Sequence, residues 1–160
     1  MMPDPIHPPA RAKSIARRLI AVLAAAACLA VVPAIAADPG GASLTVTFHG
    51  LSSGKGAVMV SLAADPAGFE GKAAPASQAR IVVAGDTASA TFTGLAPGAY
   101  AIRAFHDLVG DGKLKTNPFG IPTEPFAFSN NARGVMGPPS WPQAAFAIKA
   151  GANTQSINLD

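Results

Sequence analysis

The sequence predicts an all-β fold: a single antiparallel β-sandwich of about seven short strands, with one long ordered loop between strands five and six. Three observations support this prediction. Short runs alternate apolar and polar residues with the period of a half-buried strand, as in 43–49, where Leu44, Val46 and Phe48 face one way. Turn-forming residues separate these runs at frequent intervals. No convincing amphipathic helix follows the N-terminal leader.

The expected strands are short and joined by turn-rich segments. Residues 65–77 form a loop with room for one helical turn, and Phe69 is its expected anchor. Gly85-Asp86 is a two-residue turn of the kind that joins hairpins, and 151–153 is the turn before the last strand. The expected strands cover residues 43–49, 57–63, 78–84, 87–93, 99–107, 144–149 and 155–159.

The fifth expected strand, 99–107, has one clearly apolar face. Tyr100, Ile102, Ala104 and His106 lie on it at a spacing of two residues, whereas Arg103 lies on the opposite face. Because a strand half-buried in a sandwich turns its apolar face to the core, we expect the Tyr100 face to be buried.

A segment of about 36 residues separates Asp107 from the next expected strand, which is long for a loop inside a compact domain. Loops of this length are functional or disordered in most cases. Apolar residues punctuate this one, so we expect it to be folded down on the domain. The expected anchors are Phe119, Ile121, Phe126, Phe128, Val135, Met136 and Trp141.

Residues 1–36 are predicted to be a signal peptide and 37–160 the β-sandwich domain. A basic segment at 11–18 precedes an apolar run at 19–32, and Ala34-Ile35-Ala36 supplies the small residues that a signal peptidase reads. The apolar run is too short for a convincing membrane span, so we expect no transmembrane span in the mature form. The expected location is therefore periplasmic or secreted.

The charge and the cysteine content of the domain argue against some classes of function. The chain has 12 basic and nine acidic residues, but four of the basic ones and Asp4 lie in the leader. The domain at 37–160 therefore has eight basic and eight acidic residues. The mature domain is therefore neutral and carries no charge signal for nucleic-acid binding. The single cysteine, Cys28, lies in the leader, so the domain has neither a disulfide nor a thiol nucleophile. Lipidation of Cys28 is the less favoured alternative to cleavage after Ala36.

The start of the long loop has the spacing of half a calcium site. In Asp107-x-Val109-x-Asp111-Gly112 the glycine occupies the sixth position of a calcium loop. Calcium takes six to eight oxygen ligands, but Val109 offers none and Pro118 stands where the closing carboxylate belongs.

Other oxygen ligands in the loop could complete the shell, although Lys113 and Lys115 would oppose a cation. We expect no cofactor, with calcium as the weaker alternative and turn capping as the ordinary role of these carboxylates. The candidate metal ligands are Asp107, Asp111, Asn117 and Glu124.

Four further loop residues are candidates for organising the loop or binding a ligand: His106, Ser129, Asn130 and Trp141. We expect His106 to be a buried strand-end histidine that is hydrogen-bonded to the long loop. Asp107 points to the opposite strand face, so the two do not form a dyad. Ser129 lies in no nucleophile motif, and Ser129 and Asn130 are expected to satisfy loop backbone. Trp141 is either a loop anchor, which we favour, or an exposed platform for a sugar.

Two groups of residues resemble known proteins. The segment 94–100, Gly-Leu-Ala-Pro-Gly-Ala-Tyr, resembles a turn of prealbumin-like and collagen-adhesin B-type sandwiches. The downstream pattern resembles the family of exported bacterial proteins called domain of unknown function 2141. It comprises His106-Asp107, Gly110-Asp111-Gly112-Lys113-Leu114, Asn117, Gly120-Ile121-Pro122, Glu124, Phe128-Ser129-Asn130 and Gly137-Pro138-Pro139.

This second resemblance covers nearly the whole mature chain, about 44–159, and implies a secreted or periplasmic β-sandwich to which the family assigns no activity. The chain departs from the family pattern at Val109 and Lys115, where the family places oxygen ligands. Any ion site that the resemblance implies there therefore lacks two of its oxygen ligands in this chain.

These observations lead to three functional hypotheses. The first is a non-enzymatic binding or accessory module of the periplasm or cell envelope, whose partner is an envelope protein or a glycan. The second is a hydrolase or metal-dependent enzyme built on the loop after His106 and Asp107, which requires its side chains to face one cleft. The third is a carbohydrate-binding module that uses Trp141.

Overall fold

The computed structural model describes residues 41–52 and 54–159. The predicted signal peptide and its cleavage site lie outside the described residues. Among the described residues, no helix combines the length and the hydropathy of a membrane span.

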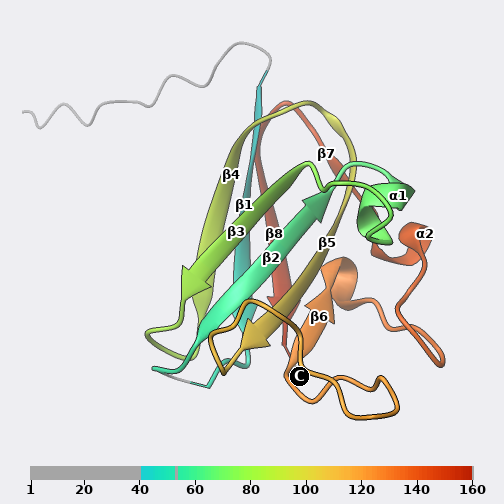
Figure 1. The fold of residues 1–160 in the computed structure, drawn as a ribbon. Coiled ribbons are helices and arrows are strands. Elements are labelled where there is room, and N and C mark those ends of the chain that lie inside the picture. The colour runs from blue at the N-terminus through green and yellow to red at the C-terminus, as the bar shows by residue number, and fades with distance from the viewer. Residues whose placement is uncertain (1–40, 53, 160) are drawn as a thin grey trace, which may run out of the picture. The chain divides into compact units, whose positions relative to one another are not determined.

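The described part of the chain is built mainly from β-strands, with two one-turn helices and one 3-10 turn (Figure 1). The prediction of an all-β fold is confirmed. The elements in chain order are β1 (Ala42–His49), β2 (Ala57–Ala63), α1 (Pro66–Phe69), β3 (Ser77–Val82), β4 (Ala88–Leu95), β5 (Gly98–Asp107), β6 (Phe126–Phe128), η1 (Ser129–Asn131), α2 (Trp141–Ala144), β7 (Phe146–Ile148) and β8 (Gly151–Asn158).

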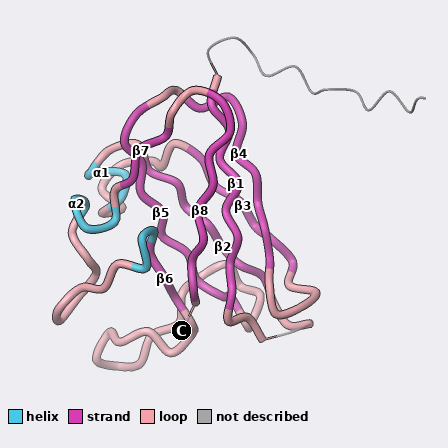
Figure 2. The backbone as a smooth tube through the Cα atoms, turned by 180° about the vertical axis from the view of Figure 1, so that it is seen from behind, coloured by secondary structure: helices cyan, strands magenta, loops and turns pink. Residues whose placement is uncertain are grey.

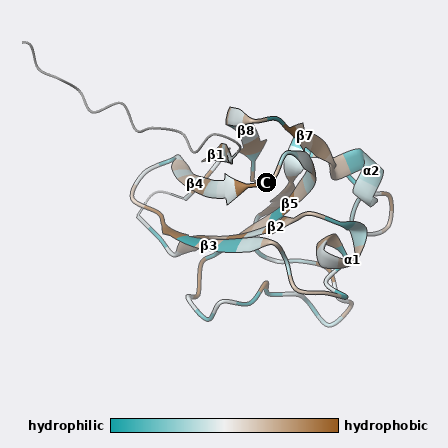
Figure 3. Ribbon diagram, turned by 90° about the horizontal axis from the view of Figure 1, so that it is seen from above, coloured by the Kyte–Doolittle hydropathy of each residue, from teal (hydrophilic) through white to brown (hydrophobic). Residues whose placement is uncertain are grey.

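The eight strands form two sheets. One has three strands in the order β4-β1-β8, and the other has five, in the order β3-β2-β5-β6 with β7 also paired to β5. Figure 3 shows the two sheets as separate layers, and Figure 2 shows both helices at one edge of the fold. The prediction of a single antiparallel sandwich of about seven strands is not confirmed, because eight strands form two sheets and β1 runs parallel to β8.

The core lies between the two sheets, as the alternation predicts. Leu44, Val46 and Phe48 of β1 are fully buried, and they belong to the same cluster as Leu62 of β2 and Ile102 of β5. Fully burying one such side chain stabilises a fold by about 1.5–3 kcal/mol. The predicted phase of β5 is confirmed, because Tyr100, Ile102, Ala104 and His106 are all buried and Arg103 is half-buried.

Gly85-Asp86 does not close a hairpin, contrary to the prediction. β3 pairs with β2 and β4 pairs with β1, so this segment crosses from one sheet to the other. The amide of Val83 donates to the carbonyl of Gly56 at 3.2 Å, and the amide of Leu51 donates to the carbonyl of Asp86 at 3.3 Å. The link between β1 and β2 thus holds the crossing segment. A two-residue turn signal is local and does not specify which strand the chain pairs with next.

The segment 151–153 was predicted as a turn but forms the start of β8. Gly151 has a φ of +89°, which sends the chain from the five-stranded sheet to the three-stranded one. The side chain of Asn153 stabilises this change of sheet. Its Oδ1 accepts from the amide of Lys149 at 3.0 Å, and its Nδ2 donates to the carbonyls of Lys149 at 2.7 Å and Ser43 at 3.2 Å.

The long loop is interrupted by a strand that the prediction missed. Phe126–Phe128 forms β6 and pairs with Arg103–Phe105 of β5, so the predicted single loop is two segments, 108–125 and 132–140. Three residues are too few to show a strand period.

Several predicted anchors of the long loop are exposed instead, which corrects the expectation that all of them fold down. Phe119 is 89% exposed and Val135 is 93% exposed. Ile121 and Met136 are exposed as well. An apolar residue in a loop buries only if another element lies within reach, and the sequence does not show this.

Candidate functional site

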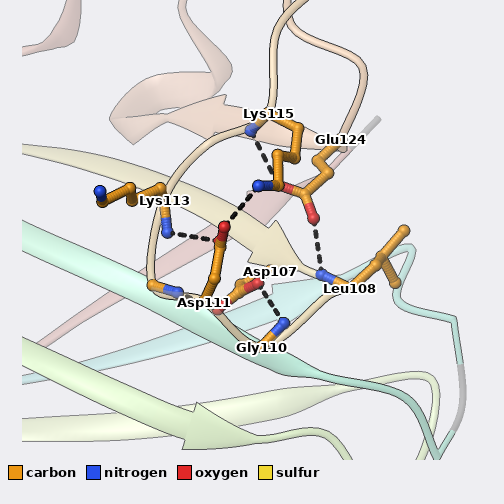
Figure 4. Close-up of polar contacts among 8 residues, drawn as sticks. Asp107, Leu108, Gly110, Asp111, Lys113, Lys115 and Glu124 are labelled. Carbon is orange, nitrogen blue, oxygen red and sulfur yellow. Dashed lines mark hydrogen bonds and ion pairs between the residues drawn. The ribbon is translucent and has the colours of Figure 1, made fainter.

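Asp107 ends β5 with a fully buried side chain that holds the first turn of the long loop. Its carboxylate accepts a hydrogen bond from the amide of Gly110 at 2.6 Å (Figure 4) and another from the amide of Gly112 at 2.7 Å. Burial raises the pKa of this carboxyl, but the amides of Gly112, Gly110 and Asp111 outweigh burial and lower the pKa below its ordinary value. Asp107 is therefore held as a carboxylate by backbone donors.

Asp111 lies on the surface of the same turn. Its carboxylate forms an ion pair with Lys115 and accepts from the amide of Lys113 at 3.1 Å (Figure 4). Lys115 first, and then the Lys113 amide, lower the pKa of Asp111, while Asp111 raises the pKa of Lys115. The lysine that was expected to oppose a cation instead neutralises one of the candidate ligands.

Glu124 closes the loop from its other end. The side chain is buried, and its two oxygens accept from the amides of Leu108 at 2.9 Å and Lys115 at 3.0 Å (Figure 4). The carboxylate of Glu124, near the end of this loop segment, thus binds both its start at Leu108 and its middle at Lys115.

Asn117 organises the tip of the loop. Its Oδ1 accepts from the amides of Phe119 at 2.9 Å and Ile121 at 3.0 Å, and its own amide donates to the carbonyl of Ile121 at 2.8 Å. This bonding makes a small hairpin that leaves Phe119 in water.

The four candidate metal ligands therefore each have backbone or lysine partners. Within 41–52 and 54–159, no three His, Cys, Asp or Glu side chains gather as a metal-binding group. The carboxylates act as acceptors for loop amides, which is the role that short carboxylates often take in turns.

His106 is fully buried, as expected, but its ring bonds a different segment from the one predicted. The ring Nε2 lies 2.7 Å from the carbonyl of Lys55, in the link between β1 and β2, and only the backbone amide of His106 reaches the long loop, at Pro125. A carbonyl only accepts, so Nε2 carries the hydrogen of this bond. The other ring nitrogen, Nδ1, is buried without a partner among the described residues.

Ser129 and Asn130 satisfy backbone groups, as predicted. The Ser129 hydroxyl accepts from the amide of Ile102 at 2.8 Å and donates to the carbonyl of Ala144 at 2.6 Å. Asn130 donates to the carbonyls of Gln143 at 3.3 Å and Ala145 at 2.9 Å. Neither side chain is placed as a nucleophile.

Trp141 packs against the domain through an edge contact with Phe69 at 5.9 Å between ring centroids. Phe69 also contacts Phe128 at 6.0 Å, and the three rings belong to a second, smaller apolar cluster. The indole is half-buried, so it does not offer the exposed flat face that a sugar platform requires.

A groove that the sequence pattern does not reveal lies on the face of the five-stranded sheet that points away from the core. Figure 3 shows the segment after β5 running along this side of the sheet. The groove has a volume of about 590 Å³, within the usual range for small-molecule sites. Its floor includes Met59, Phe105 and Phe126, and Gly112 and Leu114 of the loop line it as well.

Among the residues that the structure describes, two cations and no acidic side chain line this groove. Arg80 of β3 and Arg103 of β5 are among its lining residues. Neither guanidinium makes an ion pair with any residue that the structure describes. The only signal in the sequence was the alternation that places Arg80, Arg103 and Phe105 on outward faces, and alternation alone does not reveal a groove. His106, Asp107, Asp111 and Glu124 do not line it.

The fold and the groove define a class: a small β protein in which an outward sheet face and an overlying loop form a concave, cationic, apolar site. The chain belongs to the bacterial family described as "Uncharacterized protein conserved in bacteria (DUF2141)", which matches residues 46–156. No curated protein and no solved structure matches the chain.

Proposed function

We propose that this protein is an exported, non-enzymatic binding module of the periplasm or cell envelope, and that its ligand lies in the groove on the five-stranded sheet. The observation that carries the proposal is the groove itself, which combines an apolar floor with two arginines that lack an acidic partner among the described residues. Concave sites with apolar linings and a few polar groups are the usual form of small-molecule sites.

The side chains able to do acid–base chemistry support a binding role. Asp107 and Glu124 are buried and accept backbone amides, and the ring of His106 bonds a backbone carbonyl. A catalytic group must instead reach a cleft where a substrate can lie. None of these three side chains lines the groove.

A groove-filling variant tests the binding role. Ser61 lines the groove and is the Cα partner of both Gln78 and Arg103. We expect Ser61→Trp to abolish the thermal shifts that the purified protein shows with a panel of alkyl and aryl acids, alcohols and amines and free sugars. Thr93→Trp, at an exposed position of β4 in the other sheet, is the control and should keep them. Shifts that survive in Ser61→Trp would place the ligand elsewhere.

Export is tested separately. The basic segment, apolar run and Ala34-Ile35-Ala36 site predict that the exported protein begins at Ala37 or Asp38. Intact-mass measurement of exported material checks this directly. An intact Met1 or a lipid on Cys28 would contradict it.

A further inference from the structure

We propose that the groove binds a small amphipathic oxyanion: a molecule with an alkyl or aryl body and a terminal carboxylate or phosphate. The apolar body lies along the sheet, and the positive charges of Arg80 and Arg103 in the groove lining attract the oxyanion. This inference rests on the proposed binding role of the groove and specifies the chemistry of its ligand.

The strand register builds an apolar row that ends in a cation. Arg80 of β3 is the Cα partner of Met59, Met59 is the partner of Phe105, and Phe105 is the partner of Phe126. Partners on neighbouring strands project from the same face, and strands lie about 4.8 Å apart, so the row spans about 14 Å. A ligand lying across the strands would therefore contact apolar side chains along its body and a guanidinium at one end.

The second cation lies in the next row. Arg103 is the Cα partner of Ser61 and Phe128. Its guanidinium lies over the turn after α1, since a Cβ placed on Gly71 would be 3.4 Å from both terminal nitrogens. A guanidinium presents a planar fork of donors that matches carboxylates and phosphates, and such charged hydrogen bonds are about twice as strong as neutral ones.

Charge complementarity selects the ligand among the possible occupants. The described residues of the lining carry two positive charges and no negative charge, so an anion is favoured over a cation or a neutral molecule. The predicted leader is an unsuitable occupant, because its basic segment with Arg11, Lys13, Arg17 and Arg18 would be repelled by the same arginines.

The test compares three probes with one alkyl body. Decanoate, decyl phosphate and decan-1-ol, each kept below its micelle concentration, are titrated calorimetrically into the purified protein. We expect at least one of the two anions to bind about tenfold or more tightly than the alcohol, and the tighter anion identifies the head group. Arg80→Gln and Arg103→Gln should each weaken binding of that anion about tenfold, the usual size for a hydrogen bond to a charged group. Lys149→Gln removes the same charge from an exposed residue outside the groove and should leave binding unchanged.

Equal binding of the alcohol and the anions, unaffected by either arginine substitution, would overturn the oxyanion assignment but leave the groove as a binding site. If no amphiphile binds while another compound gives a shift that Ser61→Trp abolishes, the assignment fails and the proposed function stands. If neither kind of compound binds, both fail. A dimer that dissociates in Arg80→Gln would mean that a second copy occupies the groove, and this would also overturn the assignment.

Discussion

The hydroxyl of Ser129 accepts a hydrogen bond from the amide of Ile102 at 2.8 Å, at the point where two short strands meet on one edge of β5. β7 pairs with Gly98–Tyr100 and β6 pairs with Arg103–Phe105. The Ile102 amide lies between these two ladders, and a side chain takes the place of a strand partner there. The same hydroxyl donates to Ala144 at the end of α2, so one residue joins β5, η1 and α2.

Ser129→Ala should therefore cost about 1–3 kcal/mol of unfolding free energy, because it leaves a buried amide and a buried carbonyl without their partner. Urea unfolding of the purified protein measures this. Ser156→Ala, at an exposed position of β8, removes a hydroxyl without such partners and should change the free energy by less than about 0.5 kcal/mol. Equal losses in the two variants would show that the Ser129 hydrogen bonds contribute nothing specific.

The lowered pKa values of Asp107 and Asp111 predict acid sensitivity with a defined sign. A carboxyl whose pKa is lower in the folded state contributes stability above its unfolded pKa of about 3.9, and this stability is lost as the pH falls through the folded pKa. We expect the unfolding free energy to decline on acidification below about pH 5. Asp107→Asn and Asp111→Asn should each make the decline shallower. A wild-type stability that stays constant down to about pH 2 would contradict this.

High salt should weaken the contribution of Asp111 to stability more than that of Asp107. Asp111 pairs with Lys115 at the surface, and exposed pairs are screened at about 1 M salt, where the Debye length is about 3 Å. Asp107 is buried and bonded to backbone amides, so salt should affect its contribution much less. We expect about 1 M NaCl to reduce the effect of Asp111→Asn on the acid profile, although the Lys113 amide bond remains, and to leave that of Asp107→Asn in place.

The two faces of β5 predict very different costs for neighbouring substitutions. Ile102 is fully buried in the main core, so Ile102→Ala should cost about 2–5 kcal/mol. Arg103→Ala should cost less than about 1 kcal/mol, because its guanidinium makes no ion pair with a described residue. Denaturant midpoints of the two variants check this. Similar midpoints would mean that the strand faces are inverted.

Calcium should raise the unfolding midpoint little. The carboxylates of Asp107 and Glu124 bond loop amides, and that of Asp111 pairs with Lys115, so an ion would have to displace these partners. A ligand present at 100 times its dissociation constant would stabilise the fold by about 2.7 kcal/mol, which is a shift of many degrees in a domain of this size. A shift of several degrees in millimolar calcium, abolished by Asp107→Ala together with Asp111→Ala, would show that the loop binds the ion.

The sequence by itself determined most of the strands and the buried faces of β1 and β5. Alternation in β1 and β5 predicted the burial of Leu44 and Ile102, because a period of two turns every second side chain to the core. The roles of Asp107 and Ser129 as backbone acceptors were also predictable, since short oxygen-bearing side chains commonly bond nearby amides.

Only the tertiary structure decided which strands pair and where the groove lies. Periodicity and turn signals act over a few residues, whereas pairing depends on which distant strand is in reach. Gly85-Asp86 thus looked like a hairpin turn but carries the chain between sheets. The groove likewise requires Arg80, Arg103 and Leu114 to meet on one side of a sheet, and their separation in the chain gives no local pattern that would bring them together.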